Sequence, residues 1–201
     1  VSLVPDEQRY STPDMLQLEQ RVQDLHHAGI ASGAARVDSR RVEAAITSQP
    51  LELGVDQAAM VRAIATSGDR FQAAVGRAGA GKTTALRTAV AAWEGAGFKV
   101  VGAAPFGEAA RNLERETGLR SVTLEGLLTR LDAVADPSTV IDDKTVVIVD
   151  EASTIGNRQL DRLYRHANQT GAAVRTIGDP HQHQSVEAGG LWKHLTEVHA
   201  D

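Results

Sequence analysis

Residues 76–83 read Gly-Arg-Ala-Gly-Ala-Gly-Lys-Thr and have the spacing of a phosphate-binding loop, G-x-x-x-x-G-K-[ST]. The glycines of such a loop let the backbone curl, so that several N–H groups point at phosphate oxygens. The lysine of the pattern contacts the β and γ phosphates, and the hydroxyl that follows it ligates Mg²⁺. The pattern therefore predicts a site for a nucleoside triphosphate and magnesium. We expect its phosphate-binding residues to be Gly76, Ala78, Gly79, Ala80, Gly81, Lys82, Thr83 and Thr84, with Thr83 also ligating the metal.

The sequence on either side of this loop agrees with the prediction. Such a loop joins a strand to a helix. The run 71–75 is short and mostly apolar, as expected of a strand. The run 84–93 is rich in helix formers and places apolar residues at helical spacing. The N-terminal dipole of that helix would add to the attraction for phosphate.

Two acids follow the most apolar run of the chain. Residues 145–149 read Thr-Val-Val-Ile-Val, which is typical of a strand buried on both faces, and Asp150 and Glu151 come next. In open α/β sheets, ligands bind at the carboxyl ends of the strands. We therefore predict that Asp150 holds Mg²⁺ opposite the Thr83 hydroxyl, and that Glu151 orients or deprotonates the attacking water.

A third candidate follows the predicted strand 172–177. The residues Gly178-Asp179-Pro180-His181-Gln182 begin there, at the same edge of a parallel sheet as the acids. The Gln182 amide is a candidate for hydrogen bonding to the γ-phosphate, in a contact that changes on hydrolysis and can move a loop. An ordinary Gly-Asp-Pro turn is the alternative, and it would be the preferred interpretation of this run in isolation.

Composition bounds the possible chemistry. The chain has 201 residues, 42% of them hydrophobic, which suits one medium domain with a small appendage. It has no cysteine, which excludes disulfides, thiol catalysis and cysteine-ligated metals, and fits a cytoplasmic protein. No apolar run is long enough to predict a membrane span. The net charge of −5 is mild evidence against a domain that binds duplex DNA by itself. Because the chain lacks a starting methionine, we expect it to be a piece of a longer protein.

The chain divides into two parts by pattern. Residues 1–52 predict a small helical N-terminal subdomain, with helices at about 13–27 and 39–48, too short to hold a core unaided. Residues 53–201 alternate strands with helices, which predicts an α/β fold with a parallel sheet. Its strands are expected at 71–75, 99–104, 145–149 and 172–177, and its helices at 56–67, 84–94, 108–117, 123–134, 156–170 and 190–198.

Together these motifs carry a family resemblance. Residues 76–83, 149–153 and 178–182 resemble motifs I, II and III of superfamily I DNA helicases. The resemblance is to the RecD-like branch, which includes the helicase half of MobF-type (TraA/TrwC-like) conjugative relaxases. Further segments agree: 53–57 resembles the Q motif, 103–110 resembles motif Ia, 184–190 resembles the segment after motif III, and 9–19 resembles the run that precedes the helicase core.

The resemblance implies the first RecA-like P-loop NTPase domain of a motor that couples ATP hydrolysis to 5′-to-3′ movement on single-stranded DNA in conjugative transfer. It implies that Gln57 contacts the adenine. It also implies a second RecA-like domain that supplies transition-state arginines, and a possible relaxase domain in the same parent chain. Motifs IV to VI are not in this sequence. We therefore expect this polypeptide to bind Mg-nucleotide and to hydrolyse it poorly by itself.

The sequence departs from the family pattern in motif Ia. Phe106 and Glu108 replace a threonine and a lysine that are common there. An acidic Glu108 would repel DNA phosphates, whereas Phe106 could stack on a base, or could pack in the core or at an interface. Two other functions stay open: a nucleotide-dependent binding or assembly module without translocation, and, more weakly, a small-molecule kinase with the same loop.

Overall fold

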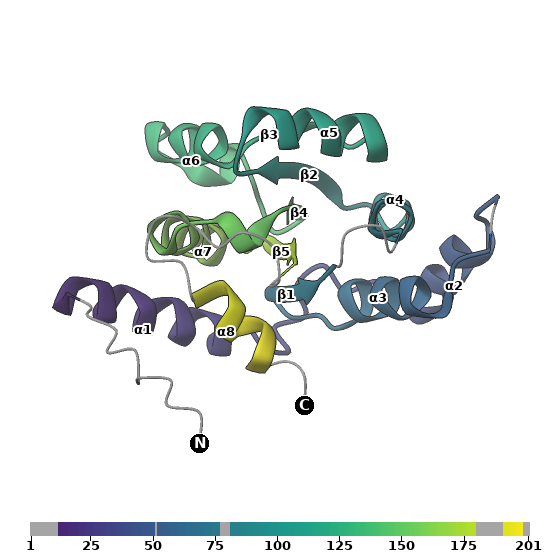
Figure 1. Ribbon diagram of the computed structural model, residues 1–201, viewed down its shortest axis with the longest axis horizontal. Helices are drawn as coiled ribbons and strands as arrows, with labels where there is room; N and C mark the ends of the chain where they lie inside the picture. Colours follow the sequence, from purple (N-terminus) through teal and green to yellow (C-terminus); the bar gives the residue numbers. More distant parts are fainter. Residues whose placement is uncertain (1–11, 51, 77–80, 180–190, 199–201) are drawn as a thin grey trace, which may run out of the picture.

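The computed structural model describes residues 12–50, 52–76, 81–179 and 191–198. These residues fold around a sheet of five parallel strands in the order β1-β5-β4-β2-β3 (Figure 1). The predicted α/β class and parallel sheet are confirmed. The strands are β1 Phe71–Val75, β2 Lys99–Ala104, β3 Ser121–Thr123, β4 Thr145–Val149 and β5 Ala173–Gly178.

Helices cover both faces of the sheet. Figure 1 shows α1, α6 and α7 on one side and α3, α4 and α5 on the other. None of the helices in the described ranges is long and apolar enough to cross a membrane. The helices are α1 Pro13–Ala28, α2 Ser39–Thr47, α3 Val55–Thr66, α4 Lys82–Gly95, α5 Gly107–Thr117, α6 Leu124–Ala133, α7 Asn157–Thr170 and α8 Leu191–Val198.

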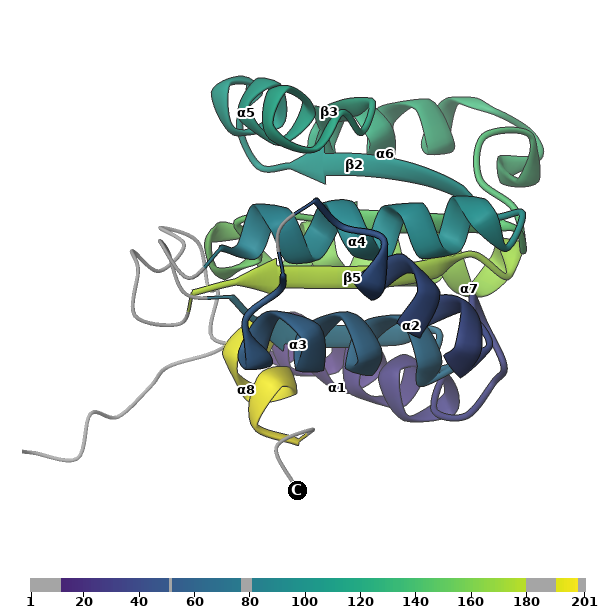
Figure 2. The same cartoon turned by 90° about the vertical axis from the view of Figure 1, so that its right-hand side faces the viewer.

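Strand β4 lies at the centre of the sheet and divides its side chains between two cores. Val147 and Val149 join the core under α6 and α7, whereas Val146 and Ile148 join the core under α3 and α4. All five residues of β4 are buried. This double burial is the reason that its sequence is apolar without alternation. Because the strands are parallel, β1, β4 and β5 end at the same edge, toward which the arrowheads of β2 and β5 point in Figure 2.

The first N-terminal helix, α1, packs on α7. Its Leu18 and Val22 belong to the core on that face. Arg21 Nε donates to Asp161 Oδ1 of α7 at 2.7 Å. The α1 helix begins as predicted, since the Thr12 side chain accepts a hydrogen bond from the backbone N–H of Met15.

The second N-terminal helix, α2, lies on the opposite face and packs on α3 and α4. Val42 is fully buried in that core. Just before this helix, the carbonyl of Ala35 accepts a hydrogen bond from Trp93 Nε1 of α4 at 2.9 Å. The two helices of the predicted N-terminal subdomain are therefore built into different layers. A functional boundary at residue 52 stays a prediction.

The structure adds elements that the sequence pattern did not predict. Strand β3 is three residues long and pairs with the end of β2, where a Cβ on Gly102 would collide with the Ser121 side chain. A strand of three residues shows no recognisable alternation, and the chain continues directly from it into α6. Two short 3₁₀ helices, Pro137–Thr139 and Ala152–Thr154, were also not predicted.

Candidate nucleotide-binding site

The phosphate-loop pattern lies where β1 ends and α4 begins. The N–H of Gly76 donates to the carbonyl of Gly178, at the end of β5, at 2.8 Å. Gly81 is the N-cap of α4, and Lys82, Thr83 and Thr84 form the first turn of the helix. The strand before the loop and the helix after it, both expected from the sequence, are therefore present. Ala78, Gly79 and Ala80 lie outside the described residues.

Two glycines of the pattern are required by their surroundings. Gly81 has φ of 71° and ψ of 26°, in the left-handed region, and a Cβ there would collide with the Gln57 amide. A Cβ on Gly76 would lie 2.9 Å from side-chain carbons of Ile177 and Lys82. The space beside these two glycines is therefore already occupied by the side chains of Gln57, Ile177 and Lys82.

The structure brings Lys82 and Asp150 together from 68 residues apart. Lys82 Nζ lies 2.6 Å from Asp150 Oδ1, and both side chains are largely buried. Asp150 directly follows β4, and the same carboxylate oxygen accepts the N–H of Glu151 at 2.8 Å. The predicted phosphate-binding lysine and the predicted metal ligand therefore share one site. In this state Asp150 engages the lysine.

Thr83 has a partner that the sequence analysis missed. Its Oγ1 donates to Glu116 Oε2 at 2.9 Å. Glu116 lies in the last turn of α5 and belongs to none of the motifs quoted above. Nothing in its spacing signals this contact, because the contact depends on how α5 packs on α4. The hydroxyl of Thr83 and the carboxylate of Asp150 are hard oxygen donors, which is the chemistry that Mg²⁺ prefers.

Glu151, the predicted base, has an unusual backbone. Its φ and ψ are 56° and 36°, so a non-glycine residue occupies the left-handed region. Such strain costs about 1–3 kcal/mol, and it is found where surrounding structure fixes a side chain at a functional site. The turn is held by Thr154 Oγ1, which donates to the Glu151 carbonyl at 2.9 Å. The sharp turn places Glu151 next to Asp150 at the carboxyl end of β4.

Gln57 lies beside a cavity of about 220 Å³. Its Oε1 accepts the N–H of Gly54 at 2.9 Å, and its Nε2 donates to the Gly81 carbonyl at 3.3 Å. The amide therefore ties the start of α3 to the end of the phosphate loop. The predicted contact between Gln57 and the adenine stays a prediction. The cavity is lined by Asp56, Gln57, Met60, Val75, Gly76, Lys82 and Ala85.

The last residue of β5 reaches the same place. A Cβ on Gly178 would lie 2.8 Å from the backbone nitrogen of Ser153, in the 3₁₀ turn after Glu151. The end of β5 therefore lies against the residues that follow β1 and β4. Gln182 lies outside the described residues, so its predicted role as γ-phosphate sensor stays a prediction.

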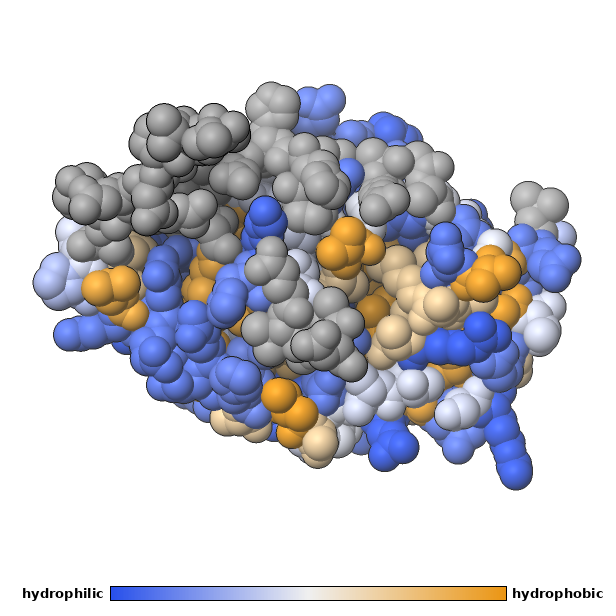
Figure 3. All heavy atoms as spheres, turned by 60° about the horizontal axis from the view of Figure 1, so that its bottom comes forward, coloured by the Kyte–Doolittle hydropathy of each residue, from blue (hydrophilic) through white to orange (hydrophobic). Residues whose placement is uncertain are grey.

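Phe106 is the N-cap of α5, and 62% of its surface is exposed. Packing of Phe106 in the core is therefore wrong for this chain, whereas packing at an interface with another part of the parent protein stays an alternative. On the face of the molecule in Figure 3, hydrophobic residues form small groups among hydrophilic ones.

A family model described as "AAA domain" matches residues 52–201. The chain is 36% identical over 196 residues to the conjugal transfer protein TraA of Rhizobium radiobacter. It is 33% identical over 189 residues to the probable conjugal transfer protein TraA of Sinorhizobium fredii. Each alignment covers 94% of this chain and 17% of the relative, so the chain spans about a sixth of the length of these proteins.

A solved structure with a similar fold is the UvsW helicase of bacteriophage T4. Its TM-score is 0.57 at 8% identity, over 82% of this chain and 67% of that chain. This likeness concerns the fold alone. The sequence relatives and the family model carry the assignment further. The chain belongs to the AAA domain family, and its resemblance to the superfamily I helicase part of TraA-type conjugal transfer proteins is confirmed.

Proposed function

We propose that this chain is the Mg-ATP-binding first motor domain of a conjugal-transfer helicase. The observation that carries the proposal is the 2.6 Å contact between Lys82 Nζ and Asp150 Oδ1. It unites the phosphate loop after β1 with the acidic turn after β4, and Thr83 is the next residue in the same helical turn. A glycine-rich turn with no phosphate-binding role is not expected to place its lysine against the aspartate that follows a buried strand.

The residues suit phosphoryl transfer to water. Lys82 exchanges its carboxylate partner for phosphate oxygens, and the loop N–H groups hold the remaining oxygens. Thr83 and Asp150 would hold Mg²⁺, which neutralises charge that develops on the phosphates. Glu151 orients or deprotonates the attacking water, and Gln182 contacts the γ-phosphate. Gln57 contacts the base, next to the cavity.

The full cycle needs groups beyond this chain. We propose that a second RecA-like domain supplies an arginine to the transition state, which is worth roughly 10³–10⁵ in rate. The parent protein would move 5′ to 3′ on single-stranded DNA in the cytoplasm, and it would carry a relaxase domain. The small fraction of each relative that the chain covers leaves room for these domains. By itself the chain binds nucleotide and turns it over slowly.

Nucleotide binding tests the proposal. A fluorescent ATP analogue with Mg²⁺ should bind the isolated chain, and Lys82→Ala should abolish binding while the thermal unfolding midpoint is retained. Absence of binding by the wild-type chain, or unchanged binding by Lys82→Ala, would overturn it. A longer chain that includes motifs IV to VI should show ATP hydrolysis stimulated by single-stranded DNA. ATP hydrolysis that is not stimulated by single-stranded DNA would favour a switch or assembly module without translocation.

A further inference from the structure

The contact between Thr83 and Glu116 joins two helices at one of the proposed metal ligands. Thr83 lies in the first turn of α4, and Glu116 lies in the last turn of α5, which packs against α4. The hydroxyl donates to the carboxylate at 2.9 Å. Among the described residues, this carboxylate is the hydrogen-bond acceptor of the predicted metal-ligating hydroxyl.

The direction of this hydrogen bond matters for metal binding. A threonine hydroxyl has one proton to donate and two lone pairs. Because the proton points at Glu116, the lone pairs are free to face another group. A carboxylate acceptor also increases the electron density on the hydroxyl oxygen, which makes it a better ligand for a hard cation. Groups that orient a metal ligand in this way change metal affinity by about 10- to 100-fold when they are removed.

We propose that Glu116 is a positioning residue for magnesium. It fixes the rotamer and the proton of Thr83, so that the hydroxyl presents lone pairs to the metal that arrives with the nucleotide. This inference rests on the proposed function of the site. It assigns a role to a residue of α5 that lies outside the helicase motifs.

A carboxylate near the loop also repels phosphates, and this repulsion acts against nucleotide binding. If the repulsion outweighed the positioning effect, Glu116 would compete with the phosphates and would have to move away before the nucleotide binds. The two roles predict opposite effects of the carboxylate on nucleotide binding. A positioning carboxylate strengthens Mg-dependent nucleotide binding, and a competing carboxylate weakens nucleotide binding with or without metal.

The experiment measures binding of a fluorescent ATP analogue across a magnesium titration and in EDTA. Glu116→Ala should raise the magnesium concentration for half-maximal binding about 10-fold or more, with binding in EDTA unchanged. Glu116→Gln keeps the shape and an acceptor oxygen, so its shift should be smaller. Glu114→Ala is the matched control, because Glu114 is exposed on the same helix and should behave as wild type.

A double-mutant cycle separates positioning from a general charge effect. Thr83→Val removes the hydroxyl, so adding Glu116→Ala to that variant should cause no further shift. The inference is overturned by an unchanged magnesium requirement in Glu116→Ala, by tighter binding, by an equal loss in EDTA, or by a full shift in the Thr83→Val background. Failure of the proposed function is a different result, namely no Mg-nucleotide binding by the wild-type chain or no effect of Lys82→Ala.

Discussion

Lys82 and Asp150 form an ion pair with 2.6 Å between Nζ and Oδ1, and they are the two side chains that Mg-ATP would draw to different partners. The lysine would turn to phosphate, and the aspartate would turn to the metal. The pair keeps both charges compensated in a largely buried place, where an unpaired charge is costly. Nucleotide binding at this site is therefore an exchange of partners.

This exchange predicts opposite effects of Asp150→Asn with and without metal. In EDTA the variant should bind an ATP analogue at least as tightly as wild type, because Lys82 is no longer held by a carboxylate. In Mg²⁺ it should bind at least about 10-fold more weakly than wild type, because a metal ligand is lost. Titration of the fluorescent analogue under both conditions measures this. Asp143→Asn, in the exposed turn before β4, is the control, and an equal loss under both conditions would contradict the exchange.

A second prediction concerns the end of the phosphate loop. Gly81→Ala should lose nucleotide binding, because the new Cβ would displace the Gln57 amide that holds the Gly81 carbonyl. It should also lose about 1–2 kcal/mol of stability, because φ is 71°. Gly97→Ala is the matched control, since Gly97 has φ of 89° and no atom within 4 Å of the new Cβ. Urea unfolding should show similar losses for both variants, with nucleotide binding lost only in Gly81→Ala. Full binding by Gly81→Ala would contradict this account.

Much of the site was predictable because it depends on local pattern and on topology. The phosphate loop has its own spacing, and the apolar run before Asp150 reveals a strand buried on both faces. Parallel strands end at one edge, so the meeting of Lys82 with the strand-end acid follows from the order of elements. Short, mostly apolar runs also located β1 and β2 at the predicted residues.

What was missed depends on packing between helices. The contact of Glu116 with Thr83 arises from the way in which α5 lies on α4, and no spacing in the sequence encodes that. The placement of α1 and α2 on opposite faces of the sheet was likewise not predictable from the sequence. Each helix shows one apolar stripe, and a stripe indicates that a helix packs without indicating on which layer.

The placement of α1 and α2 gives a third prediction. Val22 and Val42 are fully buried in the two separate cores. Val22→Ala and Val42→Ala should each lower the free energy of unfolding by about 2 kcal/mol, through lost burial and the cavity left behind. Leu16 of α1 is 56% exposed. Leu16→Ala should therefore change the free energy of unfolding by less than about 0.5 kcal/mol.

Chemical denaturation of these variants should show one transition, because each N-terminal helix shares a core with the sheet. A separate early transition, shifted by the valine variants while the main transition stays in place, would show that residues 1–52 fold as an independent unit. Unchanged stability in both variants would contradict the packing of these helices.

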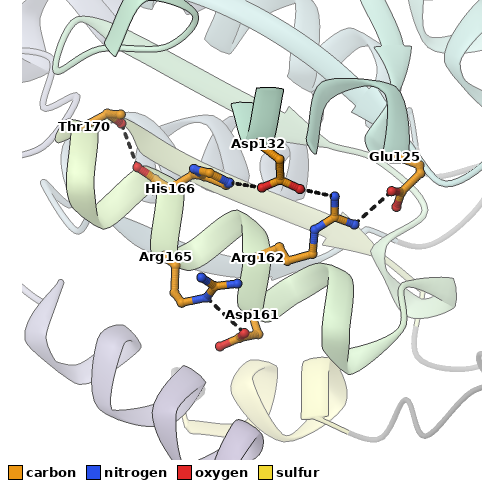
Figure 4. A network of polar contacts seen from close by, with 7 residues as sticks. All are labelled: Glu125, Asp132, Asp161, Arg162, Arg165, His166 and Thr170. Atoms are coloured by element: carbon orange, nitrogen blue, oxygen red, sulfur yellow. Dashed lines mark hydrogen bonds and ion pairs between the residues drawn. The ribbon is translucent and has the colours of Figure 1, made fainter. Parts of the chain in front are cut away.

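The last prediction concerns a charged network between α6 and α7 (Figure 4). Arg162 of α7 donates to Glu125 of α6 at 2.8 Å and also binds Asp132, which contacts His166 at 2.7 Å. The Arg162 guanidinium holds the pKa of Glu125 below its usual value. The same guanidinium, followed by the His166 ring, lowers the pKa of Asp132.

A lowered carboxyl pKa in the folded state sets the sign of the pH effect. The stabilisation is present above the unfolded pKa of each carboxyl, and it is lost as the pH falls through the folded pKa. Arg162→Met keeps most of the aliphatic stem and should lower the free energy of unfolding by ~1 kcal/mol at neutral pH, a small value because the carboxylates are about half exposed. The difference from wild type should shrink as the pH falls from about 5 to about 3. Urea unfolding at several pH values measures it, with Arg158→Met, exposed one turn earlier on α7, as control. A difference that stays constant down to low pH would mean that Arg162 acts through packing of its stem, because only the charge contribution disappears when the carboxylates are protonated.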